Sequence, residues 1–409
     1  MVSPAFMEHF SQIPDERQEG KVKHPLVSIF FIAVAAAISS CDDWEETVMW
    51  AGERIGWLRK FIDLPYGIPS DSTFERVFRF VDPKQFEKSF MAWASGIVEV
   101  GRGETVAIDG KALRGAKSAV HIVSAWLCEN GLSLGEVKTD AKSNEITAIP
   151  ELLRLLYIEG AVVAIDAMGT QTAIAEQNVK ENGADYVLAL KGNQPSMHAD
   201  AALLFTGVDL AKEQSAAEAE RKIKESAARM PSLVAAAGNG ALPPGAPAFL
   251  EMDFQTAQTI DKGHGRIERR VYATVGDIGW LSRRDEWANL QSVGIACSIT
   301  TDIMTGGVSS DTRFYLSSVN DIGQFAKSVR QHWRIESTHW TLDVAFREDK
   351  SRIRKDNEPQ NMAVIRKLAL NYLKLEKKKN PRRESFNVKR KRAMINMAYL
   401  ERVMAGDSK

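Results

Sequence analysis

The pattern of apolar and polar residues changes along the chain, and the first hundred residues follow a helical period. The longest apolar run, residues 26–40, is about 15 residues long, whereas a bilayer span needs roughly 20. It therefore predicts a buried core helix. Ser72 and Glu75 have the spacing of a capping box, which predicts the start of a later helix. Residues 1–100 are thus expected to be helical, either as a plain bundle or with a helix-turn-helix that binds DNA.

From about residue 104 the pattern becomes one of short strands. Residues 104–139 predict three strands, followed by helix, strand, helix, strand and helix up to residue 207. Residues 208–250 are rich in alanine, glycine and proline and predict an insertion. Strand patterns then return, before a long helix from about residue 321 and another at about 360–376. This order predicts a mixed α/β sheet.

Composition narrows the class of protein without identifying it. The 409 residues suggest two or three units, and 44% hydrophobic with 26% charged residues is ordinary for a soluble globular protein. The formal net charge is zero, so any affinity for nucleic acid must come from local patches. Cys41, Cys128 and Cys297 lie far apart and form no CxxC pair, which argues against a zinc ribbon or a disulfide scaffold. They are expected to be buried and reduced, as in the cytoplasm.

Two aspartates end apolar, strand-forming runs. Asp109 ends VAID and is followed by Gly110, and Asp166 ends VVAID. A carboxylate buried without a partner is costly, so two such acids on neighbouring strands would need a shared partner. A divalent cation such as Mg²⁺, which prefers oxygen ligands, would serve. The alternative for each aspartate is an ordinary turn-forming residue.

Nine segments between about residues 11 and 375 together resemble the DDE transposases of bacterial insertion sequences, in the group of the H-repeat-associated proteins. The segments are IPDERQEGKVKHPL, GIPSDSTFERVF, AIDGKALRG, KSNEITAIPELL, DAMGTQ, DYVLALKGNQ, GHGRIERR, HWRIESTHWTLDVAFREDKSRIR and NMAVIRKLALN. The resemblance implies a ribonuclease-H-like α/β core, with a β-rich insertion before the helix that carries the third acid. That arrangement agrees with the order of elements predicted above.

The resemblance also implies the catalytic residues. Asp109, Asp166 and Glu336 match the three acids of the family, which would hold two Mg²⁺ ions, with Mn²⁺ as a substitute. Asp343 lies seven residues after Glu336, about 10 Å along a helix, whereas paired catalytic metals lie only about 3.5 to 4 Å apart. Asp343 is therefore a poorer candidate than Glu336, and Glu348 is farther still.

The surroundings of this glutamate depart from the broader family. Val329, His332 and Asp343 occupy positions where many relatives have tyrosine, arginine and lysine. Phosphate contacts would then come from other residues, such as Arg330 or Arg334. The sequence also allows a different metal site, because His332, Glu336 and His339 at i, i+4 and i+7 would share one helix face and could bind zinc or iron.

Other polar and basic residues near strand ends or on this helix are expected to contact DNA. For Lys111 a solvated turn is the alternative. Residues 374–392, with ten Lys or Arg and two Glu, either bind the DNA backbone or form a solvated tail. Trp333 and Trp340 either pack in the core or stack on a flipped base. The expected DNA-binding residues are Lys111, Arg114, Lys191, Asn193, Gln194, Arg330, Arg334 and His339.

The sequence thus predicts a bacterial transposase that cleaves element ends and transfers strands with Mg²⁺. The alternatives are an inert, transposase-derived DNA-binding protein and a metal-dependent nuclease without strand transfer. Expected partners are double-stranded DNA with terminal inverted repeats, target DNA and further copies of the chain, without a membrane, in the cytoplasm or on the nucleoid. The expected domains are a helical N-terminal domain (1–100), the first part of the catalytic core (101–207), an insertion (208–320) that is flexible at 208–250 and then β-rich, core helices with the third acid (321–376) and a basic C-terminal tail (377–409).

Overall fold

The chain is organised in two compact units, each built from separate stretches of sequence. Unit 1 comprises residues 1–100, 109–157 and 334–409, and unit 2 comprises residues 101–108 and 158–333. No helix in the described ranges is long and apolar enough to cross a membrane. The computed structural model describes residues 4–113, 120–139, 145–205, 221, 222, 225, 254–263 and 265–406, so most of the 208–250 insertion lies outside the described residues.

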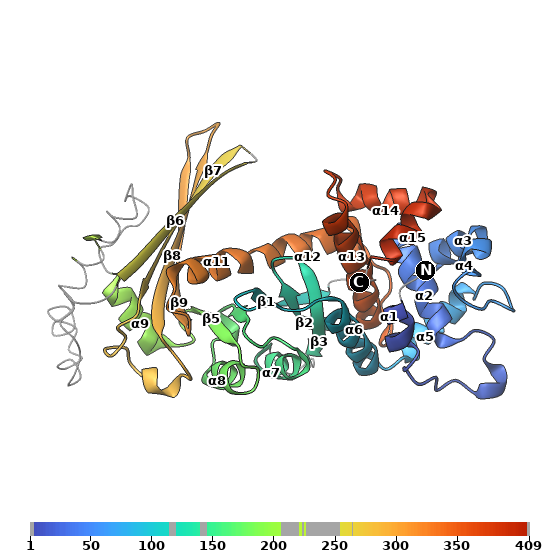
Figure 1. Cartoon of the computed structure of the whole chain (residues 1–409), viewed down its shortest axis with the longest axis horizontal. Coiled ribbons are helices and arrows are strands. Elements are labelled where there is room, and N and C mark those ends of the chain that lie inside the picture. Colours follow the sequence, from blue (N-terminus) through green and yellow to red (C-terminus); the bar gives the residue numbers. More distant parts are fainter. Residues whose placement is uncertain are drawn as a thin grey trace. The chain divides into compact units, whose positions relative to one another are not determined.

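Unit 1 is mainly helical, as predicted for the N-terminal hundred residues (Figure 1). The predicted core helix is the observed helix α2 (Leu26–Ile38), in which every residue except Val27 is buried, and it packs against α13 (Glu358–Lys379). The helices of unit 1 are α1 (Pro4–Phe10), α2 (Leu26–Ile38), α3 (Trp44–Glu53), α4 (Ile55–Leu58), α5 (Asp71–Phe80), α6 (Pro83–Ile97), α7 (Glu145–Leu155), α12 (Arg334–Ala345), α13 (Glu358–Lys379), α14 (Phe386–Ile395) and α15 (Met397–Met404).

Unit 1 also contains the antiparallel strands β2 (Val120–Leu127) and β3 (Leu132–Thr139), with α6 and α13 packed against β3. Polar and charged groups are buried at these contacts and pair with one another. Lys367 of α13 donates to Ser124 Oγ (3.0 Å) and pairs with Glu136. Gln360 Nε2 donates to Glu87 Oε1 of α6 (2.6 Å). These pairs fix the helices to one another, because an unpaired buried charge would be costly.

Unit 2 is built on a mixed sheet. The strand β1 (Thr105–Leu113) belongs to both units, since the division falls between Ile108 and Asp109. In unit 1 the strand order is β3-β2-β1, and in unit 2 it is β1-β4-β5-β9-β8-β7-β6. β4 pairs in parallel with both β1 and β5, and the remaining pairings of this series, from β5–β9 to β7–β6, are antiparallel. The other strands of unit 2 are β4 (Val162–Ile165), β5 (Asp185–Leu190), β6 (Phe254–Gly263), β7 (Arg266–Val275), β8 (Ser292–Asp302) and β9 (Val308–Ser317).

Helix α11 (Ile322–His332) covers one face of the unit 2 sheet, and its buried side chains form the hydrophobic core between helix and sheet (Figure 1). Phe325 is fully buried there and lies over Gly294 of β8, where a Cβ atom would come within 2.6 Å of Phe325 Cε2. Glycine is therefore required at this crossing. The shorter helices α8 (Thr172–Lys180) and α9 (Pro195–Leu204) also belong to unit 2. The α/β class and the mixed sheet predicted from the sequence are confirmed.

Several local predictions are wrong. α5 begins at Asp71 with Ser70 as its N-cap, so Ser72 lies inside the helix and forms no capping box. The single long helix predicted from residue 321 is two helices, α11 and α12, which are separated at Trp333. β6 was not predicted at all. Residues 386–404 form the packed helices α14 and α15, in which Arg390 is buried and pairs with Asp42 (2.8 Å), instead of a solvated tail.

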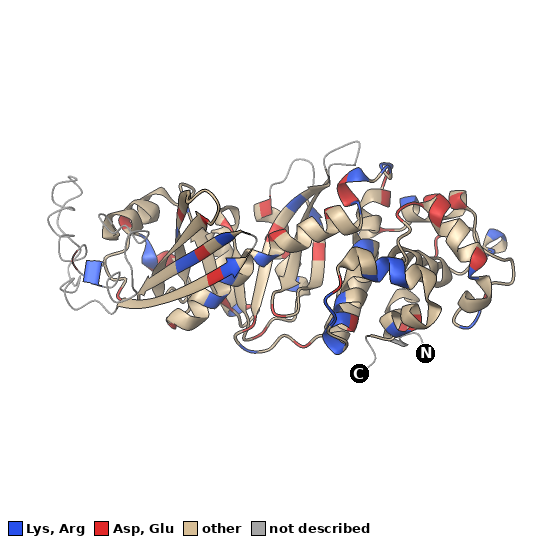
Figure 2. Cartoon of the chain, turned by 90° about the horizontal axis from the view of Figure 1, so that it is seen from above, with Lys and Arg blue, Asp and Glu red and all other residues tan. Residues whose placement is uncertain are grey.

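The cysteines match their prediction. Cys41, Cys128 and Cys297 are all free thiols and all buried. Basic and acidic residues are interspersed in each unit, as expected for a chain without net charge (Figure 2).

Candidate active site

Asp109 and Asp166 directly follow the last residues paired between the parallel strands β1 and β4. β1 itself continues to Leu113, so the prediction that Asp109 ends its strand is wrong. β1 and β4 pair in register from Thr105 with Val162 to Ile108 with Ile165. Asp109 and Asp166 are the next residues along each chain. The carboxyl ends of adjacent parallel strands form the edge at which α/β proteins place their ligands. The two aspartates, which both follow an apolar Val-Ala-Ile run in the sequence, therefore also occupy equivalent positions next to the paired residues Ile108 and Ile165.

Asp166 starts a turn that other predicted site residues support. Its Oδ1 accepts from Met168 N (3.1 Å) at the start of the 3₁₀ helix η2 (Ala167–Gly169). Asn193 Nδ2 donates to the carbonyl of Ala167 (2.5 Å), and Gln194 Nε2 donates to the carbonyl of Thr170 (3.1 Å). Both amides thus hold the backbone that follows Asp166. Their predicted contact with DNA stays a prediction.

In unit 1, helix α12 lies along the end of β1. His339 Nδ1 is 3.6 Å from Asp109 Oδ2, and Lys111 Nζ is 2.5 Å from Asp343 Oδ1. Two residues of a strand advance about 6.6 Å and four residues of a helix about 6 Å, so the two contacts are consistent with a helix that runs parallel to the strand. Glu336 precedes His339 by one helical turn and lies on the helix face of Asp343, because seven residues are close to two turns.

The carboxylates of this region remain accessible. Glu336 is exposed, and the side chain of Asp109 is 27% exposed. Burial and, to a lesser extent, the positive charge of Lys111 together lower the pKa of His339 to about 4. His339 is therefore neutral near pH 7, and its contact with Asp109 is not an ion pair.

The alternative metal site of His332, Glu336 and His339 would draw on two helices. His332 ends α11, whereas Glu336 and His339 lie on α12. His332 is partly buried, which lowers its pKa, and its Nδ1 lies 3.2 Å from the carbonyl of Ala164. Within the described ranges, no three His, Cys, Asp or Glu side chains gather closely enough to hold a metal ion. Convergence of Asp109, Asp166 and Glu336 stays a prediction.

Lys111 is the predicted site residue whose environment differs most from expectation. The solvated-turn alternative is wrong, because its side chain is only 14% exposed and its ammonium contacts Asp343 and Glu348. Among the other basic candidates, Arg330 pairs with Asp261 (2.8 Å). Lys191 and Arg334 are exposed, and Arg114 lies outside the described residues.

The two tryptophans have different surroundings. The Trp333 ring lies under the guanidinium of Arg313, 4.0 Å from ring centre to Cζ, whereas Trp340 is 63% exposed. Sequence reasoning missed Glu145, whose Oε2 would lie 2.9 Å from a Cβ atom built on Gly110. Because strand side chains alternate, that position is on the face of β1 opposite Asp109. Gly110 therefore makes room for the start of α7.

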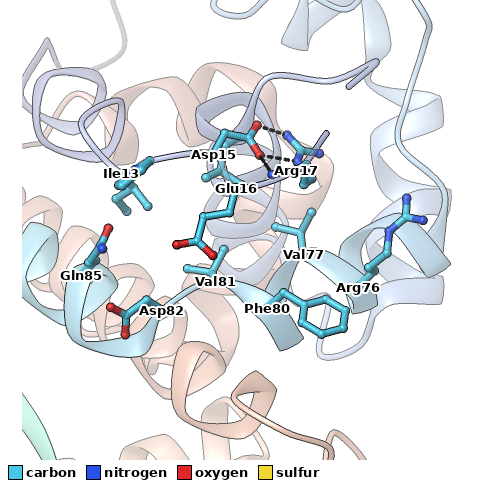
Figure 3. A pocket seen from close by; sticks show the side chains of 12 residues that line it. Ile13, Asp15, Glu16, Arg17, Arg76, Val77, Phe80, Val81, Asp82 and Gln85 are labelled. Carbon is cyan, nitrogen blue, oxygen red and sulfur yellow. Dashed lines mark hydrogen bonds and ion pairs between the residues drawn. The ribbon is translucent and has the colours of Figure 1, made fainter. Parts of the chain in front are cut away.

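The N-terminal helices carry a cavity of about 330 Å³ beside α5 (Figure 3). Its lining includes the apolar Val77 and Phe80, the acidic Glu16 and Asp82, and the basic Arg76. Arg17, also in the lining, is bound by Asp15 (2.5 Å). This mixture of charges is not the positive surface that a DNA phosphate backbone favours. DNA binding by this region stays a prediction.

Comparisons with known proteins show the family of the chain. Residues 101–372 match the family model described as a transposase DDE domain, and residues 7–94 match a model described as DDE_Tnp_1-associated. The chain is 38% identical over 417 residues to "Putative transposase YncI" of Escherichia coli O157:H7, covering 99% of the chain and 95% of the relative. It is 32% identical over 414 residues to "H repeat-associated putative transposase YhhI" of Escherichia coli K12, covering 98% and 97%.

A third relative, "Inactive transposase YbfQ" of Escherichia coli K12, is 37% identical over 71 residues, which cover 17% of the chain and 84% of that protein. Because the DDE domain model matches 272 of 409 residues (101–372) and the full-length likenesses exceed 30% identity, the family is established. The core is accordingly ribonuclease-H-like, and the chain belongs to the bacterial DDE transposases, in the group of the H-repeat-associated proteins.

Proposed function

We propose that this chain is a Mg²⁺-dependent DNA transposase whose catalytic acids are Asp109, Asp166 and Glu336. The supporting observation is the β1–β4 register, in which Asp109 and Asp166 directly follow Ile108 and Ile165, the last residues paired between these two strands. The position of α12 along β1, which puts Glu336 one turn before the contact of His339 with Asp109, adds to it. The reaction would cleave the ends of an insertion sequence and join them to target DNA.

The donor groups suit the metal that this chemistry uses. Three carboxylates offer the hard oxygen ligands that Mg²⁺ prefers, and Mn²⁺ accepts the same ligands. When bound, two such ions lower the pKa of the attacking hydroxyl group and stabilise the leaving oxygen. The chain's own contribution is to hold the carboxylates in place, with Asn193 and Gln194 supporting the turn after Asp166.

The partners follow from the reaction. The substrate would be double-stranded DNA that carries terminal inverted repeats, with a second DNA as target, in the bacterial cytoplasm and on the nucleoid. Since two ends must be joined in one event, we expect an oligomer of this chain on paired ends. Exposed Lys191 and Arg334 are the basic candidates for backbone contacts, and Arg330 would join them if it left Asp261.

The test is an integration assay with labelled terminal-repeat DNA and a supercoiled plasmid in Mg²⁺. Wild type should give joined products. Asp109→Asn, Asp166→Asn and Glu336→Gln should each lose cleavage while keeping end binding. Glu176→Gln, an exposed carboxylate paired with Lys180, is the matched control and should behave as wild type. Full cleavage by Glu336→Gln would reject its catalytic assignment.

The same assay decides between the alternatives. Cut ends without joined products would identify a nuclease without strand transfer. End binding without cutting would identify an inert protein, which is what the name "Inactive transposase YbfQ" says of that relative.

A further inference from the structure

The ammonium of Lys111 is held between two carboxylates that lie on different elements of unit 1. Its Nζ is 2.5 Å from Asp343 Oδ1 on α12 and 2.7 Å from Glu348 Oε2 in the 3₁₀ helix η5 (Glu348–Lys350). The side chains of Lys111 and Glu348 are 14% and 2% exposed. A fourth charged residue nearby, the buried Arg366 of α13, interacts with Glu348 and donates to Ser351 Oγ (3.0 Å).

This cluster is balanced in charge and specific in geometry. Lys111 and Arg366 contribute two positive charges, and Asp343 and Glu348 contribute two negative charges. Groups buried in this way are tolerated only when each keeps its partner at short distance. Small movements of α12 relative to β1 would break the bonds to Lys111 and leave charges unpaired. The cluster therefore resists both sliding and rotation of the helix.

The cluster joins the two elements that carry candidate acids. Lys111 follows Asp109 by two residues, so both side chains leave the same face of β1. Asp343 follows Glu336 by seven residues, so both leave the same face of α12. The contact between Lys111 and Asp343 thus sets the register of the strand and helix on which Asp109 and Glu336 lie.

We propose that Lys111, with Asp343 and Glu348, is a positioning residue that holds Glu336 in register with Asp109. This inference rests on the proposed function, because it matters only if those two carboxylates bind metal. In this proposal Lys111 binds Asp343 and Glu348 and does not bind DNA, because its ammonium group would have to leave both carboxylates to reach a phosphate. Two of the four acids in residues 332–354 are thereby assigned to support and not to catalysis.

The decisive variant is the double substitution Lys111→Met with Asp343→Asn. It removes one charge of each sign and leaves Glu348 with Arg366, so the charge balance is kept while the link from β1 to α12 is lost. Lys111→Arg keeps a cation that can reach both carboxylates. Lys180→Met, at an exposed lysine, is the matched control. Each protein is measured as the full chain for thermal stability, Mn²⁺ affinity without DNA, end binding, and kcat and KM of end cleavage.

We expect the double variant to bind Mn²⁺ about 10- to 100-fold more weakly, the usual loss when support behind a metal ligand is removed. Its kcat should fall by about 100-fold, as for misplacement by about 1 Å, with end binding unchanged. Lys111→Arg should recover most of both values. If the double variant does not fold, Asp343→Asn alone, which leaves Lys111 with Glu348, should still weaken Mn²⁺ binding and lower kcat. Lys180→Met should change nothing.

Wild-type Mn²⁺ affinity and kcat in a folded double variant would overturn the inference, because the cluster would then be merely structural. Lys111 would instead be a DNA-binding residue if the double variant bound DNA ends more weakly with unchanged kcat. The slope of its binding constant against salt concentration should then be smaller by about one phosphate contact. Both results leave the proposed function intact. A wild type that binds Mn²⁺ but never cuts would reject the proposed function, while the metal affinities would still test the cluster. A wild type that neither binds Mn²⁺ nor cuts would reject both.

Discussion

Glu87 provides a pH-dependent test of how the N-terminal helices are attached to α13. Its carboxylate on α6 is 4% exposed and accepts from Gln360 Nε2 of α13 (2.6 Å). Burial raises the pKa of Glu87 to about 7, against the opposing effects of the Gln360 hydrogen bond and the charge of Lys367. The folded chain therefore holds a proton here that the unfolded chain loses above its ordinary pKa of 4.5.

The sign and size follow from this difference. Between about pH 4.5 and 7 the folded state binds more protons than the unfolded state, so the free energy of unfolding falls as the pH rises. A difference of about 2.5 pH units at 1.36 kcal/mol each amounts to about 3 kcal/mol. Replacing Glu87 by glutamine keeps a neutral hydrogen-bonding group and removes the penalty. Glu87→Gln should therefore be more stable than wild type by about 1 kcal/mol near pH 5 and about 3 kcal/mol near pH 8.

The assay is urea unfolding of both proteins across this pH range, followed by circular dichroism. Glu176→Gln, at an exposed carboxylate, is the control and should differ from wild type by the same small amount at every pH. A stability difference for Glu87→Gln that does not change with pH would refute the reasoning. So would a variant less stable than wild type near pH 8, because Glu87 would then be a charged partner of Lys367.

Two further predictions concern packing and buried charge, and both are measured by urea unfolding. Gly294→Ala should destabilise the chain by about 1–3 kcal/mol because the new methyl group overlaps the Phe325 ring. Gly263→Ala is the control and should have little effect, because no atom lies within 4 Å of its new methyl group. Equal effects of the two substitutions on the free energy of unfolding would contradict this packing. Lys367→Met should lower the free energy of unfolding by about 3–5 kcal/mol because it leaves Glu136 buried without its cation. Adding Glu136→Gln should recover much of this loss. A double variant no more stable than Lys367→Met would contradict the pairing.

The strongest elements could be predicted because their patterns are local. The run at residues 26–38 is apolar on all sides, as a helix buried all round must be. The strands before Asp109 and Asp166 are short, apolar and β-branched, which is the pattern of buried parallel strands. Their pairing, with Ile108 opposite Ile165, then follows from the order of strands and helices.

The remaining features depend on contacts that the local sequence does not encode. Only Phe254 of β6 is buried, so the strand lacks the apolar alternation that would reveal it. The helix break at Trp333 involves no glycine or proline, and the ring of this residue is instead held by Arg313. The partners of Lys111 lie more than 230 residues away, so its role could not be read from the turn in which it occurs.

The central claim is that Asp109, Asp166 and Glu336 bind the same metal ions. Anomalous diffraction from crystals of the full chain soaked in Mn²⁺ tests it most directly. The account predicts manganese peaks about 2.0–2.3 Å from carboxylate oxygens of all three residues. Manganese bound without Glu336, or bound by Asp343 in its place, would contradict it.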